Sequence, residues 1–380
     1  MKPRVIHIQC HTAPFTKEHV YYGWAARTAR YMHTYAKGYE NECFYAVTSI
    51  KQEKIWKEDG ITYHLFPAWT YDKGLESFFG IIFSPLMMRA LKEIAKNKET
   101  VIHIQGERSL LVWQIISTVK NNPIFIQFHG YRTPDILLLF EKIFITPFER
   151  YFFKYVKHFF VCMRNRIPYL VDNCRIDPKK ISLQNLGVDY DLFKPRDRIE
   201  ARRKLGLPLK KTIFLFVGRF DRTKGVKEII DAHLKIKEAY DTYLILIGWT
   251  KNNEYYDYAK KNADRIIEWI DNKKLAPYFN ASDAYCMLCP PYKAKTSGMG
   301  VAPCEALACD IPILSSNLFE APTNIQSKIG FLVTNQKELE EKMNYMVNNE
   351  KHFTNIRTLT EPYYSWRAII QNILRKYNSP

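Results

Sequence analysis

The sequence has no long apolar run, and none approaches the roughly 18 residues that a transmembrane helix needs. Close to its first residue the chain enters the strand-like run Val5–Ile8, and no small-residue cleavage site follows this run. A signal peptide needs both an apolar region and such a site. We therefore expect a cytoplasmic protein without a signal peptide or a membrane-spanning helix.

Cysteine is scarce, with eight in 380 residues, and this number excludes a disulfide scaffold. Only Cys286 and Cys289 form a C-x-x-C pair, and no second pair or histidine cluster completes a metal site. Positions three apart on a strand point to opposite faces, so the pair suits packing better than chelation. We expect buried structural thiols and no bound metal.

Positive charge, in contrast, is abundant: 56 Lys and Arg against 39 Asp and Glu give a net charge of +17. Such a charge suits a nucleic acid, an anionic membrane surface or a ligand that carries phosphate. Residues 1–195 hold 27 basic and 18 acidic side chains, and the remainder holds 29 and 21. This even spread argues against a basic tail or a single nucleic-acid module, so no nucleic-acid partner is expected.

The length of 380 residues exceeds what one hydrophobic core usually supports, and a content of 47% apolar and 25% charged residues is ordinary for globular proteins. Short apolar runs alternate with helical patterns throughout, which is typical of doubly wound α/β sheets. A charged stretch, Lys194–Lys211, marks the boundary between two domains. The predicted strands are 5–10, 43–48, 61–67, 101–105, 124–130, 158–163, 181–187, 212–218, 242–248, 264–270, 284–290, 311–316 and 330–334.

The sequence therefore predicts two Rossmann-like, doubly wound domains facing across a cleft. In open α/β sheets, ligands bind beyond the carboxyl ends of the strands. Three segments place candidate binding residues at such ends.

The first segment begins after the predicted strand 212–218. Gly218 permits a sharp exit, and Arg219 and Lys224 border a loop that ends at Gly225. Arginine can hold a diphosphate through two parallel hydrogen bonds, and lysine acts as a mobile point charge. The alternative is an ordinary solvated loop between a strand and a helix.

The second segment places two glycines, Gly298 and Gly300, before a predicted helix. Free N–H groups at the start of that helix form an anion site, to which Lys293 and Lys295 add positive charge. Glu305 lies on this otherwise apolar helix, where a carboxylate is costly to bury without partners. We expect Glu305 either to accept hydrogen bonds from a vicinal diol, such as a ribose, or to pair locally.

The third segment ends the predicted strand 124–130 with His129 and Gly130. A histidine before a glycine at the carboxyl end of a strand is well placed to face a cleft, so His129 is a candidate functional residue. His7 and His103 lie inside apolar runs and are expected to be structural.

Five motifs follow one another in the second half of the chain. They are Asn185-Leu-Gly187-Val188-Asp189 with Phe193-Lys-Pro195, Phe216-Val-Gly218-Arg219 with Lys224-Gly225, Ser282-Asp283-Ala284, Glu305-Ala306-Leu-Ala and Tyr364-Ser365-Trp366. In this order they resemble the motifs of the retaining glycosyltransferases of the GT-B fold, specifically glycosyltransferase family 4, the glycosyl transferases group 1. The resemblance covers nearly the whole chain, closely from about residue 181 onward and loosely in the first 120 residues.

The resemblance implies a retaining hexosyltransferase that uses a nucleotide-diphosphate sugar and needs no metal or other cofactor. Arg219 and Lys224 would neutralise the diphosphate, and Glu305 would hold the ribose hydroxyls. His129 would contact the donor sugar near its reacting carbon. The backbone around Ser297, Gly298, Met299, Gly300 and Val301 would approach the donor phosphate and sugar.

The resemblance also implies that one domain faces the acceptor and the other binds the donor. Residues 1–195 would form the acceptor-side domain and residues 196–360 the donor domain. The terminal helix 361–380 would pack back onto the acceptor-side domain.

Two positions depart from the family pattern. Ser297 stands where the family has the first Glu of its E-x7-E motif, so a catalytically silent nucleotide-sugar binder is the alternative function. Only one glycine, Gly23, precedes the predicted helix Ala25–Tyr35, where the family has two, and Tyr22 narrows the space there. His11 is a further, weaker candidate beside the first strand.

Nine Phe or Tyr lie between Phe140 and Phe160, interleaved with basic residues. Basic aromatic helices can lie in anionic membrane interfaces, which suggests a lipid-linked or growing glycan acceptor and peripheral contact with the membrane. The alternative is a helix that packs its aromatic side chains into the core of the first domain.

Overall fold

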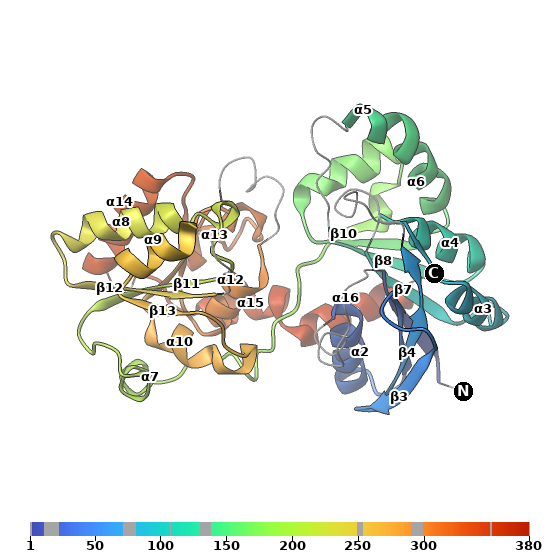
Figure 1. Ribbon diagram of the computed structural model, residues 1–380, viewed down its shortest axis with the longest axis horizontal. Coiled ribbons are helices and arrows are strands. Elements are labelled where there is room, and N and C mark those ends of the chain that lie inside the picture. Colours follow the sequence, from blue (N-terminus) through green and yellow to red (C-terminus); the bar gives the residue numbers. More distant parts are fainter. Residues whose placement is uncertain are drawn as a thin grey trace. The chain divides into compact units, whose positions relative to one another are not determined.

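The computed structural model describes residues 2–10, 23–70, 81–106, 108–129, 138–248, 254–289, 299–349 and 352–379. The chain divides into two compact units (Figure 1). The first unit comprises Met1–Gln184 and Ile369–Pro380, and the second comprises Asn185–Ala368.

The first unit contains an eight-stranded sheet in the order β10-β9-β8-β7-β1-β2-β4-β3. Its pairs are parallel except for β3, which runs antiparallel to β4 at one edge. The strands are β1 (Arg4–Gln9), β2 (Glu40–Val47), β3 (Lys54–Glu58), β4 (Ile61–Pro67), β7 (Val101–Gln105), β8 (Ile124–Phe128), β9 (His158–Val161) and β10 (Ile181–Leu183). A two-stranded hairpin, β5 (Trp69–Thr70) and β6 (Ile82–Phe83), lies outside this sheet.

Helices cover both faces of this sheet, as its continuously apolar strands require (Figure 1). One face packs against the main core with α3, α4 and α6, and α2 sits on the other face through three buried alanines. The C-terminal helix α16 also joins the first unit, because the Tyr377 hydroxyl lies 2.6 Å from Nδ1 of buried His103. The helices are α2 (Trp24–Tyr35), α3 (Pro85–Ile94), α4 (Leu110–Thr118), α5 (Leu138–Phe140), the π-helix η2 (Glu141–Ile145), α6 (Thr146–Phe153), η3 (Arg164–Arg166), η4 (Tyr169–Asn173), η5 (Pro178–Lys180) and α16 (Trp366–Tyr377).

The second unit contains a six-stranded, parallel sheet in the order β13-β12-β11-β14-β15-β16. Helices α8, α9 and α14 pack on one face, and α7, α10, α12, α13 and α15 pack on the other. Its strands are β11 (Thr212–Val217), β12 (Thr242–Ile247), β13 (Arg265–Ile267), β14 (Ala284–Met287), β15 (Ile313–Ser315) and β16 (Gly330–Leu332). Its helices are α7 (Arg198–Leu205), η6 (Arg222–Lys224), α8 (Val226–Lys237), α9 (Glu254–Asn262), η7 (Asn272–Lys274), α10 (Ala276–Ala281), α12 (Val301–Ala308), η8 (Leu318–Glu320), α13 (Gln326–Ile329), α14 (Gln336–Asn348) and α15 (Ile356–Tyr364).

These elements confirm the predicted fold class and each of the thirteen predicted strands. They add β3, β5 and β6, which the sequence analysis did not predict. All three lack the buried apolar run on which the prediction relied, because most of their side chains are exposed or half-buried.

The boundary between the units differs from the predicted one at residues 195 and 196. Val188, Tyr190 and Phe193 belong to the core of the second unit, so that unit begins at Asn185. Near the C-terminus, Ile356 and Tyr364 belong to the same core, and the first unit resumes only at Ile369 rather than at residue 361. The apolar side chains thus set both borders, whereas the prediction followed the charged stretch after Pro195.

All eight cysteines are buried, as predicted, and no disulfide joins any two of them. Burial raises the pKa of the Cys286 thiol above its ordinary value. Within the described part of the chain, no helix combines the length and apolar character needed to cross a membrane.

In the second unit, the backbone segments that follow β11, β12 and β14 approach one another closely at two glycines. Gly225 has a left-handed backbone, with φ of +66°, and a Cβ placed on it would lie 1.8 Å from the carbonyl oxygen of Leu288, just after β14. A Cβ on Gly248, after β12, would lie 1.7 Å from the carbonyl oxygen of Gly218, after β11. Only glycine permits these contacts.

Replacement of Gly225 by alanine should therefore destabilise the second unit more than the same replacement at Gly206. Gly206 also has a left-handed φ, +62°, but nothing lies within 4 Å of the position that a Cβ would take there. Both variants should lose roughly 1–2 kcal/mol for the backbone conformation. Gly225→Ala should lose roughly 1–3 kcal/mol more for the steric overlap. Urea unfolding of both variants measures the difference, and equal losses would contradict the close approach to Leu288.

Candidate functional site

The carboxyl edge of the second sheet carries the loop between β11 and α8. The Asp221 carboxylate organises this loop by accepting hydrogen bonds from Thr223 N (2.8 Å) and Thr223 Oγ1 (2.5 Å). Arg219 forms an ion pair with Asp221 at 3.2 Å, and its side chain is 64% exposed. Lys224 is half-buried and directly precedes Gly225 at the start of α8. The two predicted cations thus lie on one short loop, and Arg219 remains accessible to a ligand.

The start of α12 lies after β14 on the same edge. Gly300 is its N-cap residue, with a φ of +82°, and as a glycine it has no side chain with which to cap the helix. No acidic residue occupies the first turn of α12. The backbone N–H groups there attract an anion. Met299 is buried and Val301 is half-buried, while Ser297, Gly298, Lys293 and Lys295 lie outside the described residues.

Glu305 lies on α12 with only 3% of its surface exposed. Its Oε1 accepts a hydrogen bond of 2.7 Å from Nδ2 of Asn272, which follows β13. The structure therefore gives the carboxylate a local partner, one of the two predicted possibilities. The neighbouring Cys304 thiol is also buried. Burial raises its pKa, and the negative charge of Glu305 raises that pKa further.

Asp283, from the third motif, has a structural role. Its Oδ2 accepts hydrogen bonds of 2.6 Å from both Arg202 and the Ile213 backbone N–H, and Oδ1 pairs with Arg198. Burial raises the pKa of this carboxyl although both arginines oppose the shift. The contacts attach α7 to the sheet of the second unit.

His129 and Gly23 lie in the first unit and the other predicted site residues in the second. Gly23 has an extended backbone, and its carbonyl accepts the hydrogen bond from Arg27 N that begins α2. Trp24 brings its ring to 5.8 Å from the His129 ring, and the Arg27 guanidinium lies 5.0 Å from the Trp24 ring. Gly23 and His129 are therefore near one another through Trp24. His11 and Tyr22 lie outside the described residues.

Both ring nitrogens of His129 have partners. Gln105 Nε2 donates to Thr28 Oγ1 at 3.3 Å, which leaves Gln105 Oε1 to accept from His129 Nε2 at 3.0 Å. Nδ1 is then the acceptor, and the Cys162 thiol lies 3.9 Å from it. These contacts select the tautomer of His129 that carries its proton on Nε2.

The hydrogen bonds continue beyond Cys162 with a constant direction. Cys162 Sγ accepts from Gln127 Nε2 at 3.0 Å, Gln127 Oε1 accepts from Gln184 Nε2 at 3.0 Å, and Gln184 Oε1 accepts from Asn372 Nδ2 at 2.7 Å. We call this series, from Asn372 to Thr28, the amide chain. It links α16 to α2 through His129, and it satisfies polar groups that are costly to bury alone.

Sequence reasoning missed the glutamines of the amide chain. The signal that could have found them is a repeated pentapeptide: Val5–Gln9 and Val101–Gln105 both read Val-Ile-His-Ile-Gln. The two segments form β1 and β7 and pair residue for residue, with Gln9 beside Gln105 and Gln105 beside Gln127 of β8. A glutamine at the same position of three neighbouring strands indicates polar contacts at that edge.

Comparison with known proteins matches part of the second unit to a glycosyltransferase family. Residues 197–359 match the family model "Glycosyl transferases group 1". An uncharacterized 41.2 kDa protein in the cps region of Klebsiella pneumoniae is 23% identical over 278 residues, which cover 72% of this chain and 75% of that protein. Matches to other curated relatives span between 34% and 56% of those proteins.

Two solved structures share the fold along nearly the whole chain. Sucrose-phosphate synthase from Thermosynechococcus elongatus has a TM-score of 0.70 and 17% identity, covering 99% of this chain and 98% of that chain. Anabaena HepE in complex with UDP has a TM-score of 0.70 and 13% identity, covering 99% of this chain and 100% of that chain. Residues 197–359 therefore match the Glycosyl transferases group 1 family, and the chain has the two-unit GT-B fold of these solved structures.

Proposed function

We propose that the protein transfers a hexosyl group from a nucleoside diphosphate sugar to an acceptor hydroxyl, with retention of the anomeric configuration. One observation carries the proposal: a single sheet edge in the family-matched unit holds a cationic loop, an open helix start and a buried carboxylate. These are the groups that a diphosphate and a ribose need.

These groups would act on the negative charge that develops on the diphosphate during the reaction. As the bond between sugar and phosphate breaks, negative charge grows on the diphosphate and the sugar becomes oxocarbenium-like. Arg219, Lys224 and the first N–H groups of α12 would act as donors to the leaving group, and preorganised donors stabilise a transition state effectively. We propose that they supply this stabilisation without a divalent cation.

Glu305 is proposed to hold the ribose hydroxyls. Its Oε1 contact with Asn272 fixes the carboxylate at the end of β13, and a carboxylate accepts hydrogen bonds at both oxygens. Asn272 is then a positioning residue for Glu305. Among the structural neighbours, HepE is solved with UDP and with UDP-glucose, so UDP-sugars are the first donors to test here.

His129 is proposed to contact the donor sugar near its reacting carbon. The amide chain supports this role because it determines which ring nitrogen carries the proton. Gln105 is then a positioning residue that acts through His129. Gly23 is proposed to leave room for the sugar and phosphate.

We further propose that the acceptor is a lipid-linked or growing glycan, and that the protein works at the cytoplasmic face of a membrane. The basic aromatic segment around α6 supports this proposal. A catalytically silent nucleotide-sugar binder is the second candidate function, and Ser297 favours it because it stands in place of a donor-sugar carboxylate. Nucleotide release from a panel of nucleotide sugars separates the two, since the silent binder is stabilised by nucleotide without turnover.

Loss of the donor contacts should weaken nucleotide binding. Glu305→Ala and Lys224→Ala should each raise the Kd for UDP, GDP or ADP, whichever binds wild type, by about tenfold or more, because each removes a charge-assisted contact. Isothermal titration calorimetry measures the change. Lys227→Ala is the matched control, because Lys227 lies three residues further on and pairs with Asp231 on the surface. Wild-type affinity in both test variants would refute the donor-site assignment.

Disruption of the amide chain beside His129 should lower turnover without affecting nucleotide affinity. Gln105→Leu removes the acceptor for His129 Nε2, and we expect kcat to fall by about tenfold while the nucleotide Kd stays unchanged. Gln105→Glu retains an oxygen acceptor and should recover part of that loss. Thermal unfolding of both variants identifies a general loss of structure. If Gln105→Leu matched wild-type kcat, Gln105 would have no positioning role.

A further inference from the structure

Segment 139–154 presents a continuous apolar and basic outer surface. Its apolar members are between 45% and 68% exposed, well above what core side chains show. Lys142 and Lys154 are exposed on the same segment. We call this set the apolar–basic surface: Leu139, Phe140, Lys142, Ile143, Phe144, Phe148, Tyr151 and Lys154.

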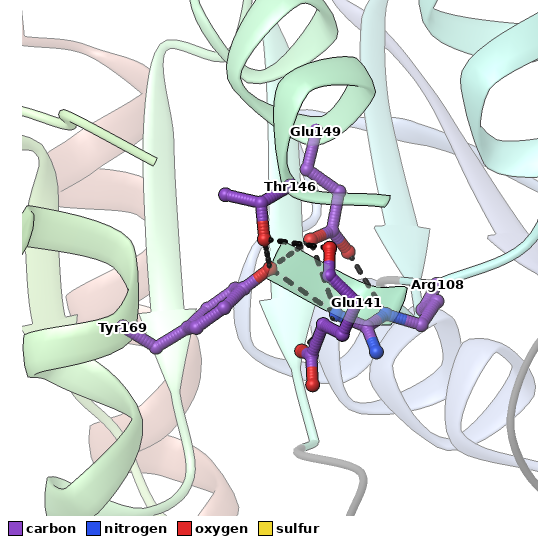
Figure 2. Close-up of polar contacts among 5 residues, drawn as sticks. All are labelled: Arg108, Glu141, Thr146, Glu149 and Tyr169. Carbon is purple, nitrogen blue, oxygen red and sulfur yellow. Dashed lines mark hydrogen bonds and ion pairs between the residues drawn. The ribbon is translucent and has the colours of Figure 1, made fainter. Parts of the chain in front are cut away.

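The acidic residues of the segment point the other way. Glu141 and Glu149 are the only acids between residues 138 and 157, and both are buried. The Arg108 guanidinium reaches Glu141 Oε1 at 2.5 Å and Glu149 Oε1 at 3.1 Å, as Figure 2 shows. The Tyr169 hydroxyl also donates to Glu149, and it lies 3.2 Å from Thr146 Oγ1. Both carboxylates of this segment are therefore turned into the unit and share Arg108, and burial raises the pKa of Glu149.

A π-helical turn makes this division possible. Thr146 N donates to Glu141 O, five residues back, so η2 adds one residue to the helical turns. In a regular α-helix two turns take about 7.2 residues, so positions eight apart diverge by roughly 80°. The extra residue brings Glu141 and Glu149 onto one face, where a single arginine contacts both. Ile143, Phe144 and Phe148, which lie between them, consequently face outward, while Ile145 packs into the core.

Aromatic contacts hold the apolar–basic surface in place. The Phe148 ring stacks on Trp113 of α4, with centroids 5.1 Å apart and planes 9° from parallel. Phe140 and Phe144 lie 4.9 Å apart, and Lys154 Nζ lies 4.2 Å from the Tyr151 ring. Because the side chains are ordered before binding, less conformational entropy is lost when the surface is covered.

The sequence left open whether this aromatic segment packs into the core or meets a membrane, and the structure divides it between a buried part and an exposed part. The helix ends at Phe153, which is buried, and Phe159 and Phe160 are buried in β9. The residues N-terminal to Phe152 supply the exposed apolar side chains, and Lys154 follows the end of the helix. The contact surface is thus one face of a short helix.

We propose that the apolar–basic surface inserts into the headgroup region of an anionic lipid bilayer. Apolar rings with lysines and no exposed carboxylate complement a surface that is apolar inside and negative outside. A protein partner with mixed surface charge matches this composition less well. The inference deepens the membrane location proposed above by naming the contact surface and the lipid class. Its test is separate from the transferase proposal, because vesicle binding requires neither donor nor acceptor.

The test is sedimentation of the full chain with vesicles of phosphatidylcholine alone or with about 30% phosphatidylglycerol. Wild type should bind the anionic vesicles at least about tenfold more strongly than the neutral ones, and salt should weaken this binding. Phe140→Ser/Ile143→Ser/Phe144→Ser should lower the partition coefficient on anionic vesicles about tenfold or more. Lys142→Glu/Lys154→Glu should also lower it about tenfold.

Matched controls separate the surface from general properties of the chain. Ile55→Ser/Trp269→Ser removes apolar side chains that are 58% and 69% exposed elsewhere, and Lys260→Glu/Lys261→Glu makes the same change in net charge on α9. Both controls should bind vesicles like wild type. Absence of wild-type binding to anionic vesicles would overturn the proposal, as would equal losses in test and control variants. Self-association that the triple serine variant abolishes, without vesicle binding, would assign the surface to a second copy instead.

Discussion

Parallel strand pairing is the constraint on which both units depend. When neighbouring strands run in one direction, their carboxyl ends meet at one edge, and each following loop must leave from there. In the second unit this brings the Lys224 loop, the start of α12 and the Asn272 turn to one border. In the first unit it aligns the three glutamines beneath His129. Residues far apart in the sequence thus become neighbours without any side-chain interaction that specifies it.

The sequence was most informative where burial is two-sided. Strands such as Ile213–Phe216 carry uninterrupted apolar runs because both faces are covered, and these were predicted together with the fold class. Strand β3 was not predicted, because it lies at a sheet edge with exposed and half-buried residues. The unit boundary was placed too late because charge at the surface says little about which core Phe193 joins.

The candidate site was predictable only in part, for a geometric reason. Arg219 comes just after β11, and Lys224 and Gly300 lie at the starts of the helices that follow β11 and β14, so a strand–helix pattern suffices to place them. The amide chain consists of side-chain contacts between residues that lie up to 188 positions apart, as in the bond from Asn372 to Gln184. No local pattern encodes such contacts. The π-helical turn is equally hidden, because its outcome is visible only where Arg108 meets both glutamates.

Some of the residues behind the net charge of +17 have a structural role that composition did not show. Several arginines serve inside the protein, where Arg202 and Arg357 bind backbone carbonyl groups in loops and at the ends of helices. A guanidinium suits this task because its donors are fixed in a plane. The carbonyls are those of Ala281, Leu209 and Lys211 for Arg202, and of Tyr190, Phe193 and Ala308 for Arg357. Part of the positive charge therefore secures chain segments and is not available to ligands.

The repeated pentapeptide of β1 and β7 bears on how the first sheet assembles. Two strands with the same five residues present the same side chains to a growing sheet, so their own sequences do not distinguish the central position from its neighbour. Their surroundings do: His7 Nε2 lies 3.0 Å from Asn41 Oδ1 of β2, whereas His103 contacts Tyr377 of α16. The contact that distinguishes β7 from β1 therefore comes from α16, a helix that is synthesised after most of the second unit.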